Sequence, residues 1–197
     1  MRELVIATKN KKKLHELRRY LKGVRANVVS LVEFRDTPRI IENGDTFKKN
    51  AVKKAVVISR FVSGLALADD SGLAVNALGG RPGVRSSRFA GPGKSDKENN
   101  RKLLKLLEDI PSARRGAKFV CAVAIADNGR IVKIIESSCS GRIAFNAKGD
   151  YGFGYDPLFL IPKYGKTFGE LGLKIKDRMS HRSKALKEAR KFLRKFL

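Results

Sequence analysis

FVCAVAIADNGRIVKIIESS, from Phe119 to Ser138, is the stretch of sequence that decides the fold. Its first part, Phe119–Ala126, is the longest apolar run in the chain and has the length of a buried strand. Asp127-Asn128-Gly129 is a turn signal, and Ile131 to about Ser138 follows it as a second strand. This order predicts an antiparallel hairpin in the middle of the chain.

Strands and helices alternate around this hairpin. The pattern predicts strands at Leu4–Ala7 and Leu65–Ala68, and the second of these ends abruptly at Asp69-Asp70-Ser71-Gly72. It predicts helices at Lys11–Leu21, from Thr46 to about Phe61, from Asp96 to about Asp109, and from Ser180 almost to the end. An S-x-x-E capping box precedes the third of these helices. Alternating elements with a hairpin among them favour an α/β fold with a mixed sheet. No internal repeat or linker divides the chain, so we expect residues 1–197 to form one domain.

The composition is strongly basic. The 197 residues include 43 Lys and Arg against 19 Asp and Glu, a formal net charge of +24. This charge points to nucleic acid, phosphate-bearing ligands or anionic membranes as partners. No apolar run approaches the roughly 20 residues that span a bilayer, so we expect no membrane segment.

Cysteine usage and the N-terminal sequence bear on the compartment. The only cysteines are Cys121 and Cys139, without CxxC spacing, which makes a zinc site improbable and predicts reduced thiols. The apolar run Leu4–Ala7 is too short for a signal-peptide core. We therefore expect a cytoplasmic protein.

The first candidate site lies between the first strand and the first helix. It is the run Thr8-Lys9-Asn10-Lys11-Lys12-Lys13. A helix N-terminus offers backbone N–H groups and partial positive charge, to which Thr8 and Asn10 add side-chain donors and Lys13 a full charge. The run is therefore a candidate phosphate cradle, and the alternative is a capped helix with solvated lysines.

The second candidate site contains acidic residues. Adjacent carboxylates such as Asp69 and Asp70 are costly to place together without a cation. Magnesium takes one or two carboxylates together with phosphate oxygens, and Glu42 could add a ligand from a neighbouring loop. The alternatives are an N-cap and turn at Asp69-Asp70 and a surface acid at Glu42.

Two further segments could bind a nucleobase. Gly152-Phe153-Gly154-Tyr155-Asp156-Pro157 places two aromatic rings among glycines, where they could stack on a flat ligand or serve only as packing anchors. Ser180-His181-Arg182, with Lys176 upstream, offers several hydrogen-bond donors, although a histidine at a helix start is usually structural. The dinucleotide pattern G-x-G-x-x-G after the first strand and the loop G-x-x-x-x-G-K-[ST] are both absent. The four segments together favour a magnesium-dependent nucleoside triphosphate enzyme.

Seven segments, in order along nearly the whole chain, resemble the non-canonical purine nucleoside triphosphate pyrophosphatases, also called inosine triphosphatases or XTP/dITP diphosphatases. They are ATKNKKKLHEL (7–17), ENGDTFKKNAVKKA (42–55), LADDSGLAVNALGGRPGVRSSRFAG (67–91), FVCAVAIA (119–126), GDYGFGYDPLF (149–159), KTFGEL (166–171) and MSHRSKAL (179–186). The resemblance implies cleavage of ITP, dITP or XTP to the monophosphate and pyrophosphate, with magnesium as cofactor. It also implies a homodimer and an elongated two-lobed fold, with a central mixed sheet flanked by helices and the active site in the cleft between lobes.

The resemblance also implies roles for individual residues. The triphosphate would be held by Thr8, Lys9, Asn10, Lys11, Lys12 and Lys13. Glu42 and Asp70 would bind magnesium with support from Asp69, Asp70 would also accept the proton, and Ser71 would contact substrate. The base and ribose would be clamped by Phe153, Gly154, Tyr155 and Asp156, Lys176 would bind substrate, and His181 and Arg182 would read the base. We expect Asp70 and Lys13 to be the catalytic pair. Asn76, where an acid is usual in the family, is one departure from the pattern.

Two other functions remain as alternatives. One is a pyrophosphatase for another modified nucleotide, such as a pyrimidine or a methylated one. The other is a basic nucleic-acid-binding protein, but its cations should gather in one stripe with interleaved aromatics, whereas Lys and Arg are dispersed here. We therefore expect no specific nucleic-acid partner.

Overall fold

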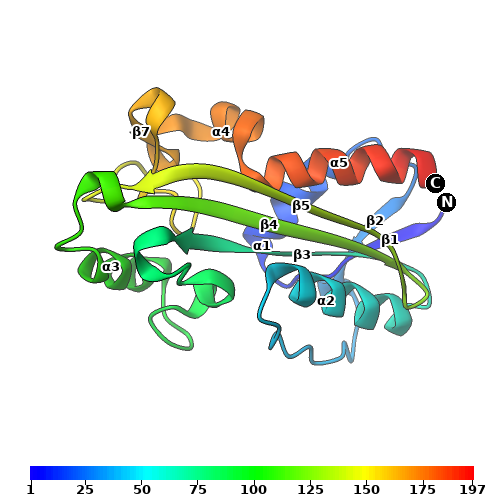
Figure 1. Cartoon of the computed structure of the whole chain (residues 1–197). Coiled ribbons are helices and arrows are strands. Elements are labelled where there is room, and N and C mark those ends of the chain that lie inside the picture. Colours follow the sequence, from blue (N-terminus) through cyan, green and yellow to red (C-terminus); the bar gives the residue numbers. More distant parts are fainter. The chain divides into compact units, whose positions relative to one another are not determined.

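A seven-stranded sheet in the order β2-β1-β3-β4-β5-β6-β7 organises the computed structural model, which describes residues 1–197 (Figure 1). The strands are β1 (Glu3–Ile6), β2 (Asn27–Ser30), β3 (Leu65–Val75), β4 (Gly116–Asp127), β5 (Arg130–Ile143), β6 (Phe159–Ile161) and β7 (Lys166–Thr167). Strand β1 runs parallel to β2 and β3, whereas β6 runs antiparallel to β5 and β7. The predicted mixed α/β sheet is confirmed.

The predicted hairpin is formed by β4 and β5, which are neighbours in the sheet. Only Asn128 and Gly129 join them, with positive φ angles of 47° and 79°. Two positive φ values are what a type I′ turn requires, and so short a connection forces the strands to run antiparallel. Both strands extend beyond the predicted ranges.

The helices are α1 (Lys11–Leu21), α2 (Phe47–Phe61), α3 (Asp96–Leu106), α4 (Phe168–Met179) and α5 (His181–Phe196), with short 3-10 turns between elements. Four of them match the predictions, although α3 ends before Asp109, while α4, β2, β6 and β7 were not predicted. None of the helices combines the length and apolarity that crossing a membrane requires.

The chain forms two compact units. The first contains residues 1–70, 121–137 and 182–197, and the second contains residues 71–120 and 138–181. The assignment of residues 1–197 to one catalytic domain stays a prediction, as do the elongated shape and the active-site cleft.

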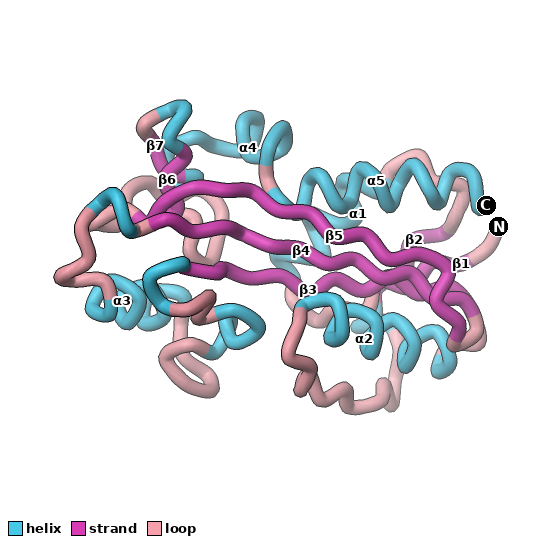
Figure 2. Tube along the Cα trace, in the orientation of Figure 1, coloured by secondary structure: helices cyan, strands magenta, loops and turns pink.

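The first unit buries both faces of its strands. Large side chains such as Leu67 and Val123 share one core with α1 and α5, while their neighbours Ala66 and Ala124 share another core with α2. The alternation follows from the pleat, because successive residues of a strand point to opposite faces. In Figure 2, α2 accordingly lies on the opposite side of these strands from α5.

The prediction that the strand beginning at Leu65 ends at Asp69 is wrong. Strand β3 continues to Val75, because Leu73 and Val75 are fully buried in the core of the second unit. The backbone N–H of Leu73 also donates to Ser86 Oγ over 2.9 Å. Asp69 and Asp70 therefore lie inside a strand, where the pleat directs them to opposite faces.

The second unit packs β-strands and helices around aromatic side chains. The rings of Phe119 and Phe159 have centroids 4.4 Å apart, and the rings of Phe159 and Phe168 are 5.4 Å apart. Strand residues and Leu103 of α3 complete this core. The core fixes the base of the Gly152–Pro157 loop, since Tyr155 is itself one of its members.

Candidate active site

The Thr8–Asn10 turn and the first turn of α1 contain the residues of the predicted phosphate cradle, whose role in binding stays a prediction. Thr8 Oγ1 accepts from the Asn10 backbone N–H over 3.2 Å, and Asn10 Oδ1 accepts from the Lys13 N–H over 3.1 Å. These bonds cap α1, which is the alternative that the sequence left open for this run. Lys9, Lys11 and Lys12 are exposed, whereas Lys13 is half-buried.

Asp69 is buried between two cations on the face of the sheet that α1 and α5 cover. Its Oδ2 atom lies 3.2 Å from Lys13 Nζ and 3.4 Å from Arg182 Nε. Burial alone would raise the pKa of Asp69, but the charges of Lys13, Arg182 and Lys54 outweigh it and hold that pKa well below its usual range. Asp69 is therefore a permanent anion that fixes Lys13 beside the first turn of α1.

Arg182 joins Asp69 to α1. Besides Asp69, its guanidinium contacts Glu16, whose Oε2 atom accepts from Nη1 over 2.8 Å. Burial opposes the charge on Arg182, but Asp69 and Glu16 more than compensate and raise its pKa. The base-reading role predicted for Arg182 stays a prediction, and the structure adds a role in linking the start of α5 to α1 and β3.

Asp70 faces α2 instead. Asn50 Nδ2 donates to Asp70 Oδ2 over 3.1 Å, and Asn50 Oδ1 accepts from the Gly44 N–H over 2.8 Å. A Cβ atom on Gly44 would lie 2.7 Å from Asn50 Oδ1, so this close approach requires glycine. Asn50 therefore ties the Asn43–Asp45 loop to the predicted catalytic carboxylate.

Lys54 lies between the Glu42 and Asp70 carboxylates. Its Nζ atom is 2.9 Å from Glu42 Oε2 and 3.9 Å from Asp70 Oδ1. Burial disfavours its charge, but the Asp69, Asp70 and Glu42 carboxylates outweigh that cost and raise the pKa of Lys54. For Asp70, burial and the neighbouring Glu42 charge raise the pKa against the opposing effects of Lys54 and Lys13.

The carboxylates fit magnesium through two ligands. The Glu42 and Asp70 carboxylates both lie close to Lys54 Nζ and therefore close to each other. Magnesium needs only one or two protein carboxylates in addition to phosphate oxygens and water. Asp69 points to the opposite face of β3, and no three His, Cys, Asp or Glu side chains are grouped to hold one ion. Glu42 and Asp70 are therefore the two residues that could bind magnesium, whereas Asp69 contacts Lys13 and Arg182.

The predicted base clamp is held together by Asp156. Its Oδ2 atom accepts from the Phe153 N–H over 2.8 Å and from Lys176 Nζ over 2.7 Å. Lys176 Nζ also lies 5.0 Å from the centre of the Phe153 ring. Gly152 has a φ of +84°, and a Cβ atom there would lie 2.0 Å from Asp156 Oδ2. One buried carboxylate thus fixes the aromatic ring and the lysine in one arrangement.

The remaining loop residues are anchored to α3 and the core. The Gly154 N–H donates to Asp96 Oδ2 over 2.8 Å, and Asn100 Nδ2 donates to the Gly154 carbonyl over 3.1 Å. Tyr155 is buried, and its hydroxyl donates to the Ser86 carbonyl over 2.8 Å. Tyr155 is therefore a packing anchor in this structure.

His181 is buried at the end of the second unit. Its ring stacks on Phe119 with centroids 4.7 Å apart and an interplanar angle of 11°. Ser71 directly follows Asp70 and is half-buried. The substrate contacts predicted for both residues stay predictions.

Three residues of these clusters were missed from sequence. Glu16 is three positions after Lys13, which places both on one face of α1. Asn50 and Lys54 are four positions apart and directly precede Ala51 and Ala55 of the buried stripe of α2. The sequence signal that could have identified these three residues is the helical spacing of polar side chains beside an apolar stripe.

Comparisons with known proteins show the family to which the chain is similar. The sequence profile of the Ham1 family matches residues 4–192. A dITP/XTP pyrophosphatase of Desulforamulus reducens is 52% identical over 192 residues, which cover 97% of this chain and 95% of the relative. A dITP/XTP pyrophosphatase of Geobacillus kaustophilus is 48% identical, with 94% and 91% covered.

A solved structure of the same family is also similar in fold. A HAM1 protein from Coxiella burnetii has a TM-score of 0.90 and 37% sequence identity, and the match covers 99% of this chain and all of that one.

Proposed function

Since the chain belongs to the Ham1 family, we propose that it hydrolyses non-canonical purine nucleoside triphosphates, such as ITP, dITP and XTP, to the monophosphate and pyrophosphate. The observation that carries the proposal is the position of Lys13. Its Nζ atom lies 3.2 Å from Asp69 Oδ2, at the N-terminal turn of α1. A fixed cation beside a helix N-terminus suits a triphosphate. The family relatives named dITP/XTP pyrophosphatases support this substrate class.

The phosphate groups would bind to the run from Thr8 to Lys13. Backbone N–H groups in the first turn of a helix lack intrahelical acceptors and point toward an anion. Lys13 would stabilise the charge that develops on the leaving pyrophosphate, because it is already oriented by Asp69 and needs no rearrangement.

Asp70 would accept the proton of the attacking water. Burial and the nearby Glu42 carboxylate raise its pKa, which makes it a better proton acceptor than an exposed aspartate, and Asn50 fixes its orientation. Glu42 and Asp70 would also hold magnesium, which when bound neutralises phosphate charge and polarises the phosphorus centre.

The base would be selected through Phe153, Lys176 and His181. Phe153 offers a ring face, and the Asp156–Lys176 pair keeps it in place. Hydrogen-bond donors that bind the 6-oxygen of hypoxanthine or xanthine would find no acceptor at the 6-amine of adenine and would stay unpaired. Buried unpaired donors can discriminate by about 10⁴-fold.

A panel of triphosphates tests the proposal. Pyrophosphate and orthophosphate release would be measured for ITP, dITP, XTP, ATP, GTP and dTTP, with magnesium and with a chelator. We expect pyrophosphate from the first three, loss of activity with the chelator, and a far lower kcat/KM for ATP. Hydrolysis of ATP as fast as ITP, or release of orthophosphate alone, would contradict it.

We also propose that the chain acts as a homodimer in the cytoplasm, as the family resemblance implies. Cys121 and Cys139 are both buried thiols, which suits a reducing compartment. Light scattering should give twice the mass of the chain, and a monomer mass at micromolar concentration would contradict the dimer.

A further inference from the structure

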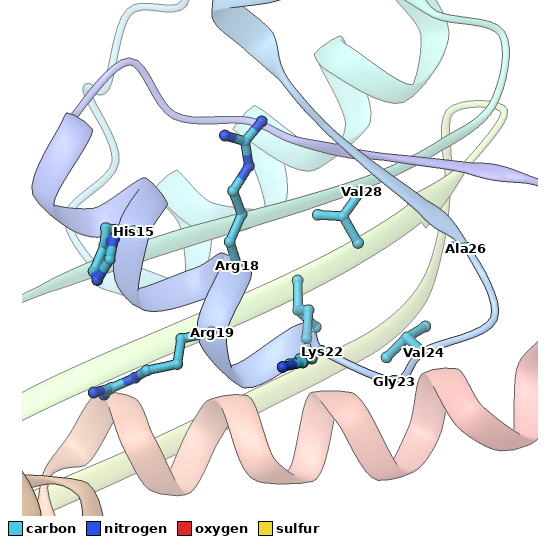
Figure 3. A pocket seen from close by; sticks show the side chains of 9 residues that line it. His15, Arg18, Arg19, Lys22, Gly23, Val24, Ala26 and Val28 are labelled. Carbon is cyan, nitrogen blue, oxygen red and sulfur yellow. The ribbon is translucent and has the colours of Figure 1, made fainter.

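A hollow at the C-terminal end of α1 lies apart from the predicted phosphate cradle. It has a volume of about 450 Å³ and is formed by the end of α1, the turn at Lys22–Val24 and the residues that lead into β2. Figure 3 shows side chains of α1 on one side of the hollow and Val24 and Val28 on the other. All these residues belong to the first unit.

The polar part of the lining consists of His15, Arg18, Arg19 and Lys22, and no acidic residue lines the hollow. Arg18 pairs with Glu33 over 2.8 Å, but the two side chains are 48% and 50% exposed. Figure 3 shows the Arg18 side chain pointing away from Lys22, so Lys22 is the lining cation that lies next to Gly23.

Arg190 adds a cation from α5 beside the hollow. Gly23 lines the hollow with a φ of +83°, and a Cβ atom on it would lie 3.4 Å from Arg190 Nη2. The Nε atom of Arg190 is buried and has no hydrogen-bond partner. A buried N–H group without an acceptor is destabilising, and an anionic oxygen at Gly23 would lie next to this guanidinium.

The rest of the lining is aliphatic. Leu21, Val24, Ala26 and Val28 form it, and the volume falls within the range of small-molecule sites. Free phosphate would contact the cations but leave this surface uncovered. A ligand with a phosphate group and a flat or apolar body would use both parts.

We propose that this hollow is a second binding site, distinct from the predicted active site, for a phosphate ester with a planar body, such as a nucleoside monophosphate. The phosphate contacts Lys22 and the Arg190 guanidinium beside Gly23, while the planar body covers Val24 and Val28. The site depends on none of the residues assigned to hydrolysis.

Adenosine 5′-monophosphate is the probe for the test, with inorganic phosphate and adenosine in separate titrations. Amide chemical shifts of the full chain would locate binding, and calorimetry would give Kd. We expect saturable shifts at Lys22, Gly23 and Val24, and weaker binding of phosphate or adenosine alone. Shifts confined to residues 8–13 and 69–71 would overturn the inference and leave the proposed function intact.

A pair of double variants separates a built site from general attraction. Lys22→Gln/Arg190→Gln should raise the Kd for the probe by about tenfold or more, because two charge-assisted contacts are lost. Lys191→Gln/Lys195→Gln removes the same charge from exposed positions of α5 and should change Kd less than about twofold. Equal weakening by both variants, or tighter binding of duplex DNA through the same residues, would overturn the inference.

Discussion

Lys13 Nζ lies 3.2 Å from Asp69 Oδ2, and this contact joins the first turn of α1 to the middle of β3. The carboxylate is almost fully buried, and Arg182 Nε approaches the same oxygen to 3.4 Å. One anion thus fixes two cations, of which Lys13 belongs to the proposed triphosphate site.

Asp69→Asn should destabilise the protein strongly. The amide cannot balance the charges of Lys13 and Arg182, and uncompensated buried charges cost about 3–5 kcal/mol. Chemical denaturation measures the free energy of unfolding. Asp45→Asn is the control, because Asp45 pairs with Lys49 in an exposed position and should leave the midpoint unchanged. Equal midpoints for the two variants would contradict the structural role of Asp69.

Arg182→Lys should uncouple Glu16 from the cluster. One ammonium group cannot reproduce the separate contacts that the guanidinium makes with Asp69 and Glu16. A double-mutant cycle of Arg182→Lys with Glu16→Gln should therefore give a coupling energy above about 0.5 kcal/mol. Additive effects on stability, combined with a raised KM for ITP, would indicate that Arg182 reads the base instead.

Asp156→Asn should weaken substrate binding while the chain stays folded. Loss of the charge loosens Lys176 and the Phe153 loop, so we expect KM for ITP to rise by about tenfold with a smaller change in kcat. Steady-state kinetics measures both, and Asp150→Asn at an exposed neighbouring position is the control. A fall in kcat at constant KM would contradict the clamp.

Glu98 should titrate near pH 2. Its carboxylate accepts from the Ser95 backbone N–H and interacts with Lys94, and these contacts lower its pKa from 4.5 to about 2. Because the folded pKa lies below the unfolded one, its stabilisation of α3 is complete above pH 4.5 and is lost as the pH falls towards 2. The carboxyl carbon resonance measures the midpoint, and a value near 4.5 would contradict this contact.

Local signals explain what the sequence could predict. The turn at Asn128-Gly129 and the caps at Asn10, Thr46 and Ser95 depend on neighbouring residues, so the hairpin and the helix starts follow from short patterns. The short strands β6 and β7 have no such signal, because they pair at the edge of a sheet that distant residues form.

Partners far apart in the sequence explain what could not be predicted. The Asp69-Asp70 pair suggested one shared metal, but the continuation of β3 sends the two carboxylates to opposite faces with separate cations. The contact between Glu16 and Arg182 spans 166 positions, so nothing local reveals it. Residue types suggested a chemistry for the candidate site, whereas the pairings between its residues required the fold.

The most direct test of the central claim is pyrophosphate release from ITP by the wild type and the Asp70→Asn variant. Asparagine keeps the size of the side chain but cannot accept the proton, so kcat should fall by about 10²-fold or more. Circular dichroism and the unfolding midpoint should show that the variant is folded. Turnover close to wild type in the folded variant would contradict the role of Asp70 and the mechanism built on it.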